Sequence, residues 1–288
     1  MKATVIGASG LVGSHLMRTC QQRGWEVTGT YHNFEQPGLV PLKLTDKEGV
    51  EALIKSYQPD VIFLPAFRSS VDYCEQNPEE TYQINVVGSL NVAHIAQDVG
   101  AKLVFYSSDY VFDGEDGPYS ETDKPNPICV YGKQKLEIEQ KIAQLLDDYL
   151  IVRVTVVYGH EAQGKNFVTR LVNTLKNGQT LNVPQDQVGS PTLVNDIAEA
   201  SCRLVEVGAK GIFHVAGTDV MDRYQFAVKA AEVFELPTEN IIPVLTPDLG
   251  QPAKRPLKAG MLCDKLVKTL NWNLRGINKG LIHLKETS

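Results

Sequence analysis

The first half of the chain alternates short apolar runs with longer amphipathic runs, and this alternation is typical of a parallel sheet covered by helices. The apolar runs contain few polar residues, as expected for strands that are buried on both faces. The predicted strands of this half are Lys2–Ile6, Glu26–Thr30, Leu39–Leu42, Asp60–Leu64, Lys102–Ser107 and Leu150–Thr155.

The amphipathic runs between these strands predict helices. Gly24 stands where a helix C-terminus is expected, and Thr45 with Glu48 has the spacing of a capping box. The predicted helices are Leu11–Arg23, a segment that opens at Thr45 and ends before Pro59, Pro78–Val99 and Val130–Leu146. The fold class that follows is α/β, with a Rossmann-type, doubly wound parallel sheet.

The second half of the chain is less regular. Helices are expected at Asn166–Asn177 and Asn195–Val205, with a strand at Gly211–Val215 and helices joined by Pro-rich connections after Met221. We therefore expect a smaller, mostly helical substrate lobe built from separate pieces of chain. The predicted division assigns 1–157 and 188–216 to the dinucleotide-binding domain, and 158–187 and 217–288 to the substrate-binding lobe.

Composition narrows the classes of partner. The 288 residues include 28 Lys and Arg against 34 Asp and Glu, for a net charge of −6. This balance provides no cationic field for nucleic acid or for an anionic membrane surface. The longest apolar stretch, Val61–Phe67, is interrupted by Pro65 and is far too short to span a bilayer. We expect no nucleic acid and no membrane among the partners.

The five cysteines are scattered along the chain and form no C-x-x-C pair. This pattern predicts neither a disulfide framework nor a zinc site, and it fits a reducing, cytoplasmic location. No other group of ligand-type side chains stands out, so no metal site is predicted, and whether a divalent ion assists assembly stays open.

A glycine-rich segment, Gly7–Gly13, follows the first predicted strand and opens the first predicted helix. Glycines let a backbone approach a pyrophosphate closely, and a helix N-terminus offers unpaired N–H groups and a positive dipole to it. This context predicts a dinucleotide site.

The second predicted strand bears on which dinucleotide is bound. An acidic residue at its end would bind the adenosine ribose of NAD, but Val27–Asn33 contains none. Thr30, His32 and Asn33 could donate hydrogen bonds to a 2′-phosphate. The segment favours NADP(H), and NAD(H) stays open.

Tyr131 and Lys135 lie four residues apart on a predicted helix, so both side chains share one face. A nearby ammonium favours the phenolate and lowers the pKa of a tyrosine, which allows the pair to move protons. Ser108 follows the strand Lys102–Ser107, at the edge of the sheet where ligands bind in open α/β folds. Ser108, Tyr131 and Lys135 are therefore the predicted catalytic residues, acting with hydride from a nicotinamide.

Several segments carry a resemblance to a known family. The chain resembles the extended short-chain dehydrogenase/reductases, and more narrowly their dTDP-4-dehydrorhamnose reductase branch, which includes the regulatory β subunit of methionine adenosyltransferase. The segments with this resemblance are Gly7–Gly13, Ser107–Gly114, Pro118–Glu121, Tyr131–Lys135, Asp186–Thr192, Phe213–Gly217 and Arg255–Pro256.

The resemblance implies roles for particular positions. Ser108, Tyr131 and Lys135 match the catalytic triad, and Lys135 would also hold the nicotinamide ribose. Asn85 matches a helix asparagine near the active site, which we group with the substrate residues. The residues implied for the phosphate-binding turn and the adjoining cofactor loop are Gly7, Ser9, Gly10, Leu11, Val12 and Ala66. Those implied for the nucleotide-sugar pocket are Asn166, Gln187 and Arg255, of which Arg255 could pair with a diphosphate.

The chain also departs from this family pattern. Val156 occupies a position where rhamnose-pathway reductases tend to have a substrate-stacking tryptophan, and Phe67–Ser69 differs from the usual loop before Val71. Leu64–Pro65 replaces a common Asn-Ala, and Lys43 replaces an acid or amide. These changes leave the predicted fold in place and leave the identity of the sugar open.

The leading hypothesis is an NADPH-dependent reductase of a 4-keto-6-deoxy sugar nucleotide. One alternative is a regulatory or binding protein that keeps the cofactor site and serves a partner enzyme, like the methionine adenosyltransferase β subunit. A dehydratase or epimerase is the third reading; Ser108 is followed by Asp109–Tyr110 rather than the Asp-Glu pair of dehydratases. Whether the chain forms a homodimer stays open.

Overall fold

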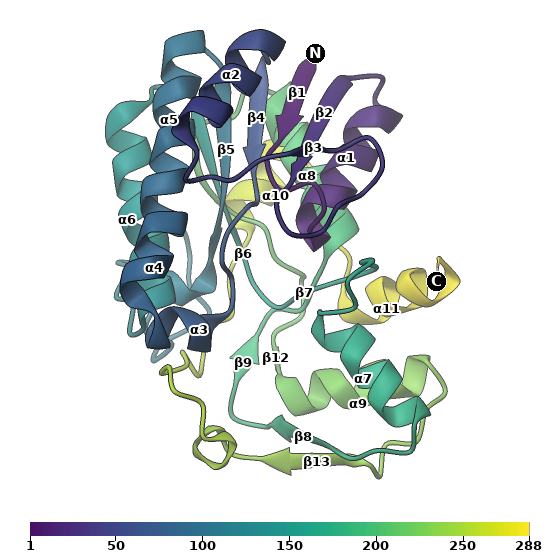
Figure 1. Ribbon diagram of the computed structural model, residues 1–288. Helices are drawn as coiled ribbons and strands as arrows, with labels where there is room; N and C mark the ends of the chain where they lie inside the picture. Colours follow the sequence, from purple (N-terminus) through teal and green to yellow (C-terminus); the bar gives the residue numbers. More distant parts are fainter. Residues whose placement is uncertain (288) are drawn as a thin grey trace.

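The centre of the molecule is a parallel sheet of seven strands, in the order β11-β6-β5-β4-β1-β2-β3 (Figure 1). The computed structural model describes residues 1–287. The chain starts in the middle of the sheet, builds one half and then crosses to build the other, which confirms the predicted doubly wound fold. The strands are β1 (Lys2–Val5), β2 (Glu26–Tyr31), β3 (Val40–Pro41), β4 (Val61–Leu64), β5 (Lys102–Ser108), β6 (Tyr149–Val154) and β11 (Gly211–His214).

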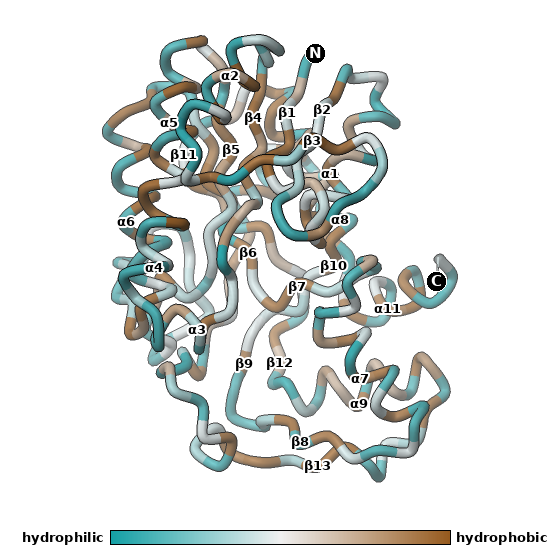
Figure 2. The backbone as a smooth tube through the Cα atoms, in the orientation of Figure 1, coloured by the Kyte–Doolittle hydropathy of each residue, from teal (hydrophilic) through white to brown (hydrophobic). Residues whose placement is uncertain are grey.

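Helices cover both faces of this sheet, which is why its central strands are almost wholly apolar (Figure 2). Every residue of β4 and of β5 is buried. One face packs against α1 (Leu11–Gln22), α8 (Val194–Glu206) and α10 (Asp264–Leu270). The other face packs against α2 (Lys47–Tyr57), α5 (Gly88–Val99) and α6 (Val130–Leu145).

Most of the remaining elements form a smaller assembly below the carboxyl ends of the strands (Figure 1). Its core includes Tyr158, Phe226 and Leu281, all buried. Its helices are α7 (Phe167–Lys176), α9 (Arg223–Val233) and α11 (Ile277–Glu286). Its short strands are β7 (Val157–Tyr158), β8 (Leu181–Pro184), β9 (Val188–Gly189), β10 (Thr192–Leu193), β12 (Met221–Asp222) and β13 (Ile241–Val244).

Some local predictions differ from the structure. Asp46, not Thr45, caps α2, because its carboxylate accepts a hydrogen bond from the Gly49 N–H at 3.0 Å. The predicted helix Pro78–Val99 consists of α4 (Pro78–Tyr82), a π-helical turn η1 (Gln83–Val87) and α5. The elements that the prediction omitted are α3 (Val71–Gln76), the single turns η2 (Asp109–Val111) and η3 (Thr246–Leu249), and the short strands of the smaller assembly.

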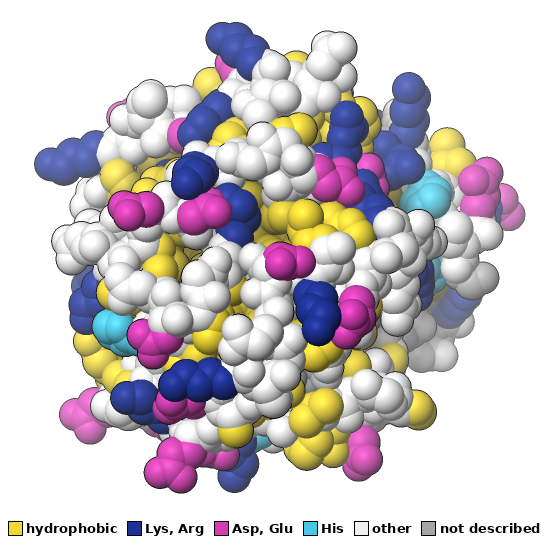
Figure 3. Space-filling model, turned by 90° about the horizontal axis from the view of Figure 1, so that it is seen from above, with side chains coloured by type: hydrophobic (Ala, Val, Ile, Leu, Met, Phe, Trp, Pro, Cys, Tyr) yellow, Lys and Arg dark blue, Asp and Glu magenta, His cyan; other side chains and the backbone are white. Residues whose placement is uncertain are grey.

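The end of the molecule where the sheet strands begin shows basic and acidic side chains intermixed (Figure 3). No helix within residues 1–287 is long and apolar enough to cross a bilayer. The described residues also contain no group of three or more His, Cys, Asp or Glu side chains placed to hold a metal ion.

Candidate active site

The glycine turn after β1 is shaped by two close backbone approaches. Gly7 has φ +97°, and a Cβ there would lie 2.9 Å from Ala66, the residue that follows β4 and Pro65. A Cβ on Gly13 would lie 2.1 Å from the Gly7 carbonyl oxygen. The Thr30 hydroxyl supports the turn from β2 by accepting a hydrogen bond from the Gly7 N–H at 3.1 Å. These contacts require glycine at both positions.

The turn presents the N-terminus of α1. Gly10 is the N-cap residue and supplies no side-chain cap. Ser9, Leu11 and Val12 are partly exposed around this helix end. The Ser9 carbonyl oxygen accepts a hydrogen bond from Gln163, a residue that the sequence did not single out.

His32 and Asn33 are exposed in the loop that follows β2. Thr30 differs from them, because it is 1% exposed and its hydroxyl is engaged with the turn. Of the three predicted 2′-phosphate donors, His32 and Asn33 are therefore exposed to solvent. Thr30 is buried against the glycine turn.

At the carboxyl end of β5, Ser108 is joined to a buried carboxyl group. The Ser108 hydroxyl donates to Asp109 Oδ1 at 2.7 Å, and the Thr155 hydroxyl donates to Asp109 Oδ2 at 2.6 Å. Burial raises the pKa of Asp109, and these two hydroxyls oppose the rise. The hydrogen bond with Asp109 thus fixes the orientation of the Ser108 side chain.

Tyr131, in the first turn of α6, lies beside Ser108. Burial raises the pKa of Tyr131, and a hydrogen bond with the Ser108 side chain acts in the opposite direction. Two rings meet Tyr131 edge-on, Phe67 and Tyr110, each with its centroid 5.5 Å from that of Tyr131. Tyr131 is therefore a neutral phenol at neutral pH, held between two aromatic side chains. Its pKa is raised by burial, whereas the sequence spacing predicts that Lys135 lowers it.

Lys135 lies one turn further along α6, with its ammonium 5.8 Å from the centre of the Tyr131 ring. Its Nζ donates to the Tyr106 carbonyl oxygen at 2.6 Å. Burial lowers the pKa of Lys135 to about 7, against an opposing effect of Glu139. Glu139 itself forms a buried ion pair with Arg153 of β6, with Nη2 and Oε2 2.6 Å apart. The structure thus brings the three predicted catalytic residues together.

Asn85 and Asn166 are held by other parts of the chain. Asn85 is 0% exposed; its carboxamide oxygen accepts from the Arg68 N–H at 2.8 Å and its amide donates to Gln134 at 2.8 Å. Asn166 is the N-cap of α7 and also donates to the Gly159 carbonyl oxygen at 2.8 Å. Both side chains brace the loops around the site.

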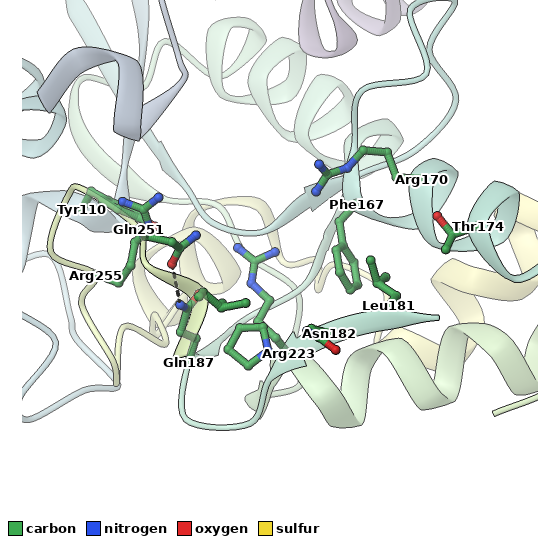
Figure 4. A pocket seen from close by; sticks show the side chains of 12 residues that line it. Tyr110, Phe167, Arg170, Thr174, Leu181, Asn182, Gln187, Arg223, Gln251 and Arg255 are labelled. Carbon is green, nitrogen blue, oxygen red and sulfur yellow. Dashed lines mark hydrogen bonds between the residues drawn. The ribbon is translucent and has the colours of Figure 1, made fainter. Parts of the chain in front are cut away.

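Tyr110, whose ring meets that of Tyr131, forms part of the wall of a cavity of about 480 Å3. Arg170, Arg223 and Arg255 line it, and its wall contains no acidic side chain (Figure 4). The remaining wall residues are Tyr110, Phe167, Thr174, Leu181, Asn182, Pro184, Gln187, Leu249 and Gln251. Two of the predicted pocket residues, Gln187 and Arg255, therefore face this cavity.

The three guanidinium groups differ in their partners. Arg255 Nη2 lies 2.6 Å from Asp72 Oδ2, which neutralises its charge. Arg223, at the start of α9, lies over the Phe167 ring, with its guanidinium carbon 5.6 Å from the ring centre. Burial lowers the pKa of Arg223; Tyr110 and Asp109 oppose this effect, and repulsion by Arg170 and Arg255 adds to it. The cavity therefore has the electrostatics of an anion site.

Val156 lies between β6 and β7 with φ +43°, a conformation that β-branched residues rarely adopt. Its side chain packs against the core of the smaller assembly. A Cβ added to Gly189 would lie 2.9 Å from Val156 Cγ2. Val156 thus packs where the chain passes from the sheet to the smaller assembly.

Sequence reasoning missed several residues that border the site. Asp109 and Tyr110 follow Ser108 directly, so their position after a buried strand was an available signal. Arg170 and Arg223 lie on helices far apart in the chain, and no spacing relates them. In the sequence, Phe67 stands out only because Phe67–Ser69 differs from the usual loop of the family that the chain resembles.

A family model described as the RmlD substrate binding domain matches residues 1–287. Among curated proteins, the chain is 34% identical over 274 residues to methionine adenosyltransferase 2 subunit beta of Xenopus laevis, covering 93% of this chain and 82% of that protein. It is 35% identical over 266 residues to a protein of Haloferax volcanii described as a probable low-salt glycan biosynthesis reductase, Agl14, covering 90% and 89%.

Solved structures agree on the fold. The dTDP-4-dehydrorhamnose reductase of Bacillus anthracis, determined in complex with NADP, has a TM-score of 0.92 and 29% identity, covering 100% of this chain and 99% of the other. A protein of Clostridium acetobutylicum described as a dTDP-4-dehydrorhamnose reductase has a TM-score of 0.90 and 31% identity, with coverage of 100% and 99%. The similarity thus extends over both the sheet and the smaller assembly.

Proposed function

Because the chain belongs to the family of the RmlD substrate binding domain, we propose that it is an NADPH-dependent reductase of a 4-keto-6-deoxy sugar nucleotide. The observation that carries the proposal is the meeting of Ser108, Tyr131 and Lys135 beside an arginine-lined cavity. A proton donor and an anion site in one place are what reduction of a sugar nucleotide requires.

The residues around the glycine turn fit a dinucleotide. The turn leaves no room for a Cβ at Gly7 or Gly13, and the helix end behind it has no side-chain cap. A bound NADPH would supply the hydride. We assign the phosphates to Gly7, Ser9, Gly10, Leu11 and Val12, with Ala66 beside them, and the nicotinamide ribose to Lys135.

NADP(H) is favoured over NAD(H) for two reasons. The end of β2 carries no acidic side chain between positions 27 and 33 that would repel a 2′-phosphate. His32 and Asn33 are exposed there and can donate to it, while Thr30 supports the turn. In addition, the similar reductase of Bacillus anthracis was determined with NADP.

The cavity fits the diphosphate of a sugar nucleotide. Arg255 is neutralised by Asp72, which leaves the guanidinium groups of Arg170 and Arg223 directed toward the same space (Figure 4). Two positive charges match the two negative charges of a nucleoside diphosphate ester, and guanidinium groups can bind phosphate oxygens in pairs. Gln187, on the same wall, would contact the same ligand.

The catalytic step follows from the protonation states in the site. Tyr131 is a neutral phenol, so it can donate its proton to the oxygen of a ketone that accepts hydride. Ser108, fixed by Asp109, would hold that oxygen in place. Lys135 lies beside the ring and, when protonated, stabilises the phenolate that Tyr131 leaves behind.

The direct test is NADPH oxidation, followed by absorbance, with a dTDP-4-keto-6-deoxy sugar as substrate. The proposal predicts turnover that depends on the ketone. Absence of oxidation with any 4-keto sugar nucleotide, in a preparation that binds NADPH, would count against it.

A second candidate is a regulatory subunit. The observation that favours it is the similarity to the methionine adenosyltransferase β subunit over 93% of the chain. This reading predicts a stable complex with a partner enzyme, a change in that enzyme's activity, and no ketone reduction. The same oxidation assay, run beside co-purification from the source cell, separates the two.

A further inference from the structure

Three groups contact the ammonium of Lys135. The ring of Phe67 lies directly over it, with the ring centre 3.4 Å from Nζ, and the ring centre of Phe105 lies 4.7 Å away. The Tyr106 carbonyl oxygen accepts a hydrogen bond from Nζ at 2.6 Å. Lys135 as a residue is only 4% exposed. The Phe67 ring therefore covers one side of this ammonium.

The neighbours differ in how firmly they are held. Phe105 and Tyr106 belong to β5, which pairs with β4 on one side and β6 on the other. Phe67 belongs to the connection between β4 and α3, outside any helix or strand, and is partly exposed. Phe67 is therefore the group that can move at the lowest cost.

The connection between β4 and α3 is held at Arg68, the residue after Phe67. The buried Asn85 accepts from the Arg68 N–H at 2.8 Å and donates to the Arg68 carbonyl oxygen at 3.4 Å. These bonds hold the backbone at Arg68, so Phe67 would move by turning its side chain, which also breaks the edge-on contact of its ring with Tyr131. Asn85 thereby directs the ring toward Lys135 without touching the ammonium.

We propose that Phe67 is a positioning residue: its ring covers the Lys135 ammonium and turns away when a ribose of the dinucleotide binds there. The inference rests on the proposed function, because it takes the dinucleotide to be the ligand of Lys135. A ribose oxygen must come within about 3 Å of Nζ to accept a hydrogen bond, and the centre of the Phe67 ring lies 3.4 Å from that atom.

The contact between the Phe67 ring and the Lys135 ammonium affects cofactor binding. A desolvated cation–π contact must be broken before the ribose can bind, so part of the binding free energy is used to displace the ring. The adenosine end of the cofactor, at the far end of the glycine turn, does not meet this obstacle. The effect of Phe67 is therefore confined to ligands that reach Lys135.

The first experiment compares two ligands on three proteins by calorimetry. NADPH reaches Lys135, whereas adenosine 2′,5′-bisphosphate contains only the adenosine end. Phe67→Ala is expected to lower the Kd for NADPH about 2- to 30-fold and to leave the Kd for adenosine 2′,5′-bisphosphate unchanged. Phe67→Tyr, which keeps the ring, is expected to restore the wild-type Kd. Equal or weaker NADPH binding by Phe67→Ala, with the bisphosphate unaffected, would overturn the proposal.

The second experiment observes the contact itself by NMR of the lysine ε-CH2 group, assigned by its loss in Lys135→Met. The Phe67 ring current shifts this signal upfield in the free chain, and Phe67→Ala is expected to reduce the shift. Saturating NADPH should reduce it in the wild type, while adenosine 2′,5′-bisphosphate should not.

The outcomes separate this proposal from the proposed function. A signal that stays shifted under saturating NADPH overturns the displacement of Phe67 and leaves the reductase assignment standing. Failure of both the wild type and Phe67→Ala to bind NADPH overturns both together.

Discussion

The ring of Tyr131 meets the ring of Tyr110 edge-on, with centroids 5.5 Å apart and planes at 87°. Tyr110 also forms part of the wall of the arginine-lined cavity. The proposed proton donor is thus separated from the proposed substrate site by the thickness of one side chain. A ligand whose diphosphate lies on the arginines can place its sugar beside Tyr131.

The arginine cavity gives the first prediction. Replacing Arg223 by Gln removes a partly buried charge from a cavity wall that carries no acidic side chain. If it binds the diphosphate, Arg223→Gln should raise KM for the sugar nucleotide about 10- to 100-fold and leave the Kd for NADPH unchanged. Lys176→Gln, at an exposed site on α7, is the control for charge alone. A KM equal to that of Lys176→Gln would show that Arg223 does not bind the substrate.

The glycine turn gives the second prediction. In Gly13→Ala the new Cβ would meet the Gly7 carbonyl oxygen at 2.1 Å, so the turn must shift. We expect NADPH to bind about 5- to 150-fold more weakly, as measured by fluorescence titration. Urea unfolding of Gly13→Ala beside the wild type checks that the variant is folded, so that a change in affinity reports on the turn. Unchanged NADPH affinity in Gly13→Ala would show that the cofactor does not use this turn.

The third prediction concerns stability and pH in the cofactor-free chain. The pKa of Lys135 is lowered to about 7, whereas an unfolded lysine has a pKa of about 10.4. Between these values the unfolded chain binds a proton at Lys135 that the folded chain does not. The contribution of Lys135 to the free energy of unfolding therefore rises with pH, by about 1.4 kcal/mol per unit from pH 7 to pH 10, and is constant below pH 7.

Urea unfolding at pH 7, 8 and 9 tests this slope. Lys135→Met should lose it, so that the difference in unfolding free energy between wild type and variant changes steadily with pH. Lys133→Met, at an exposed position on the same helix, should keep the wild-type slope. A pH-independent difference between wild type and Lys135→Met would mean that this lysine is not desolvated.

The fold could be predicted from the sequence to a large extent, because its signals are local. The strands of the sheet are continuous apolar runs, such as Val61–Leu64, and the covering helices have amphipathic periodicity. The short strands of the smaller assembly were not predictable, since two to four residues are too few to show an alternation. The cap of α2 was misplaced by one residue because Thr45 and Asp46 are both good caps.

The candidate site was predictable in part, for a related reason. Tyr131 and Lys135 are one helical turn apart, so their sequence spacing gives their relation in space. The cavity, in contrast, is formed by Arg170, Arg223 and Arg255, which only the tertiary fold brings together. Phe67 could be seen as unusual in the sequence, but its contact with Lys135 depends on how the Asn85 carboxamide holds the loop.

The central claim is that Tyr131 donates the proton in a ketone reduction. Phenylalanine at this position keeps the ring and its contacts with Phe67 and Tyr110 while removing the hydroxyl. The most direct measurement is therefore NADPH oxidation by wild type and Tyr131→Phe with a dTDP-4-keto-6-deoxy sugar, beside NADPH binding by both. We predict that kcat falls about 10²- to 10⁴-fold in the variant while its Kd for NADPH stays within about threefold of the wild type. Retained turnover in Tyr131→Phe would contradict the account.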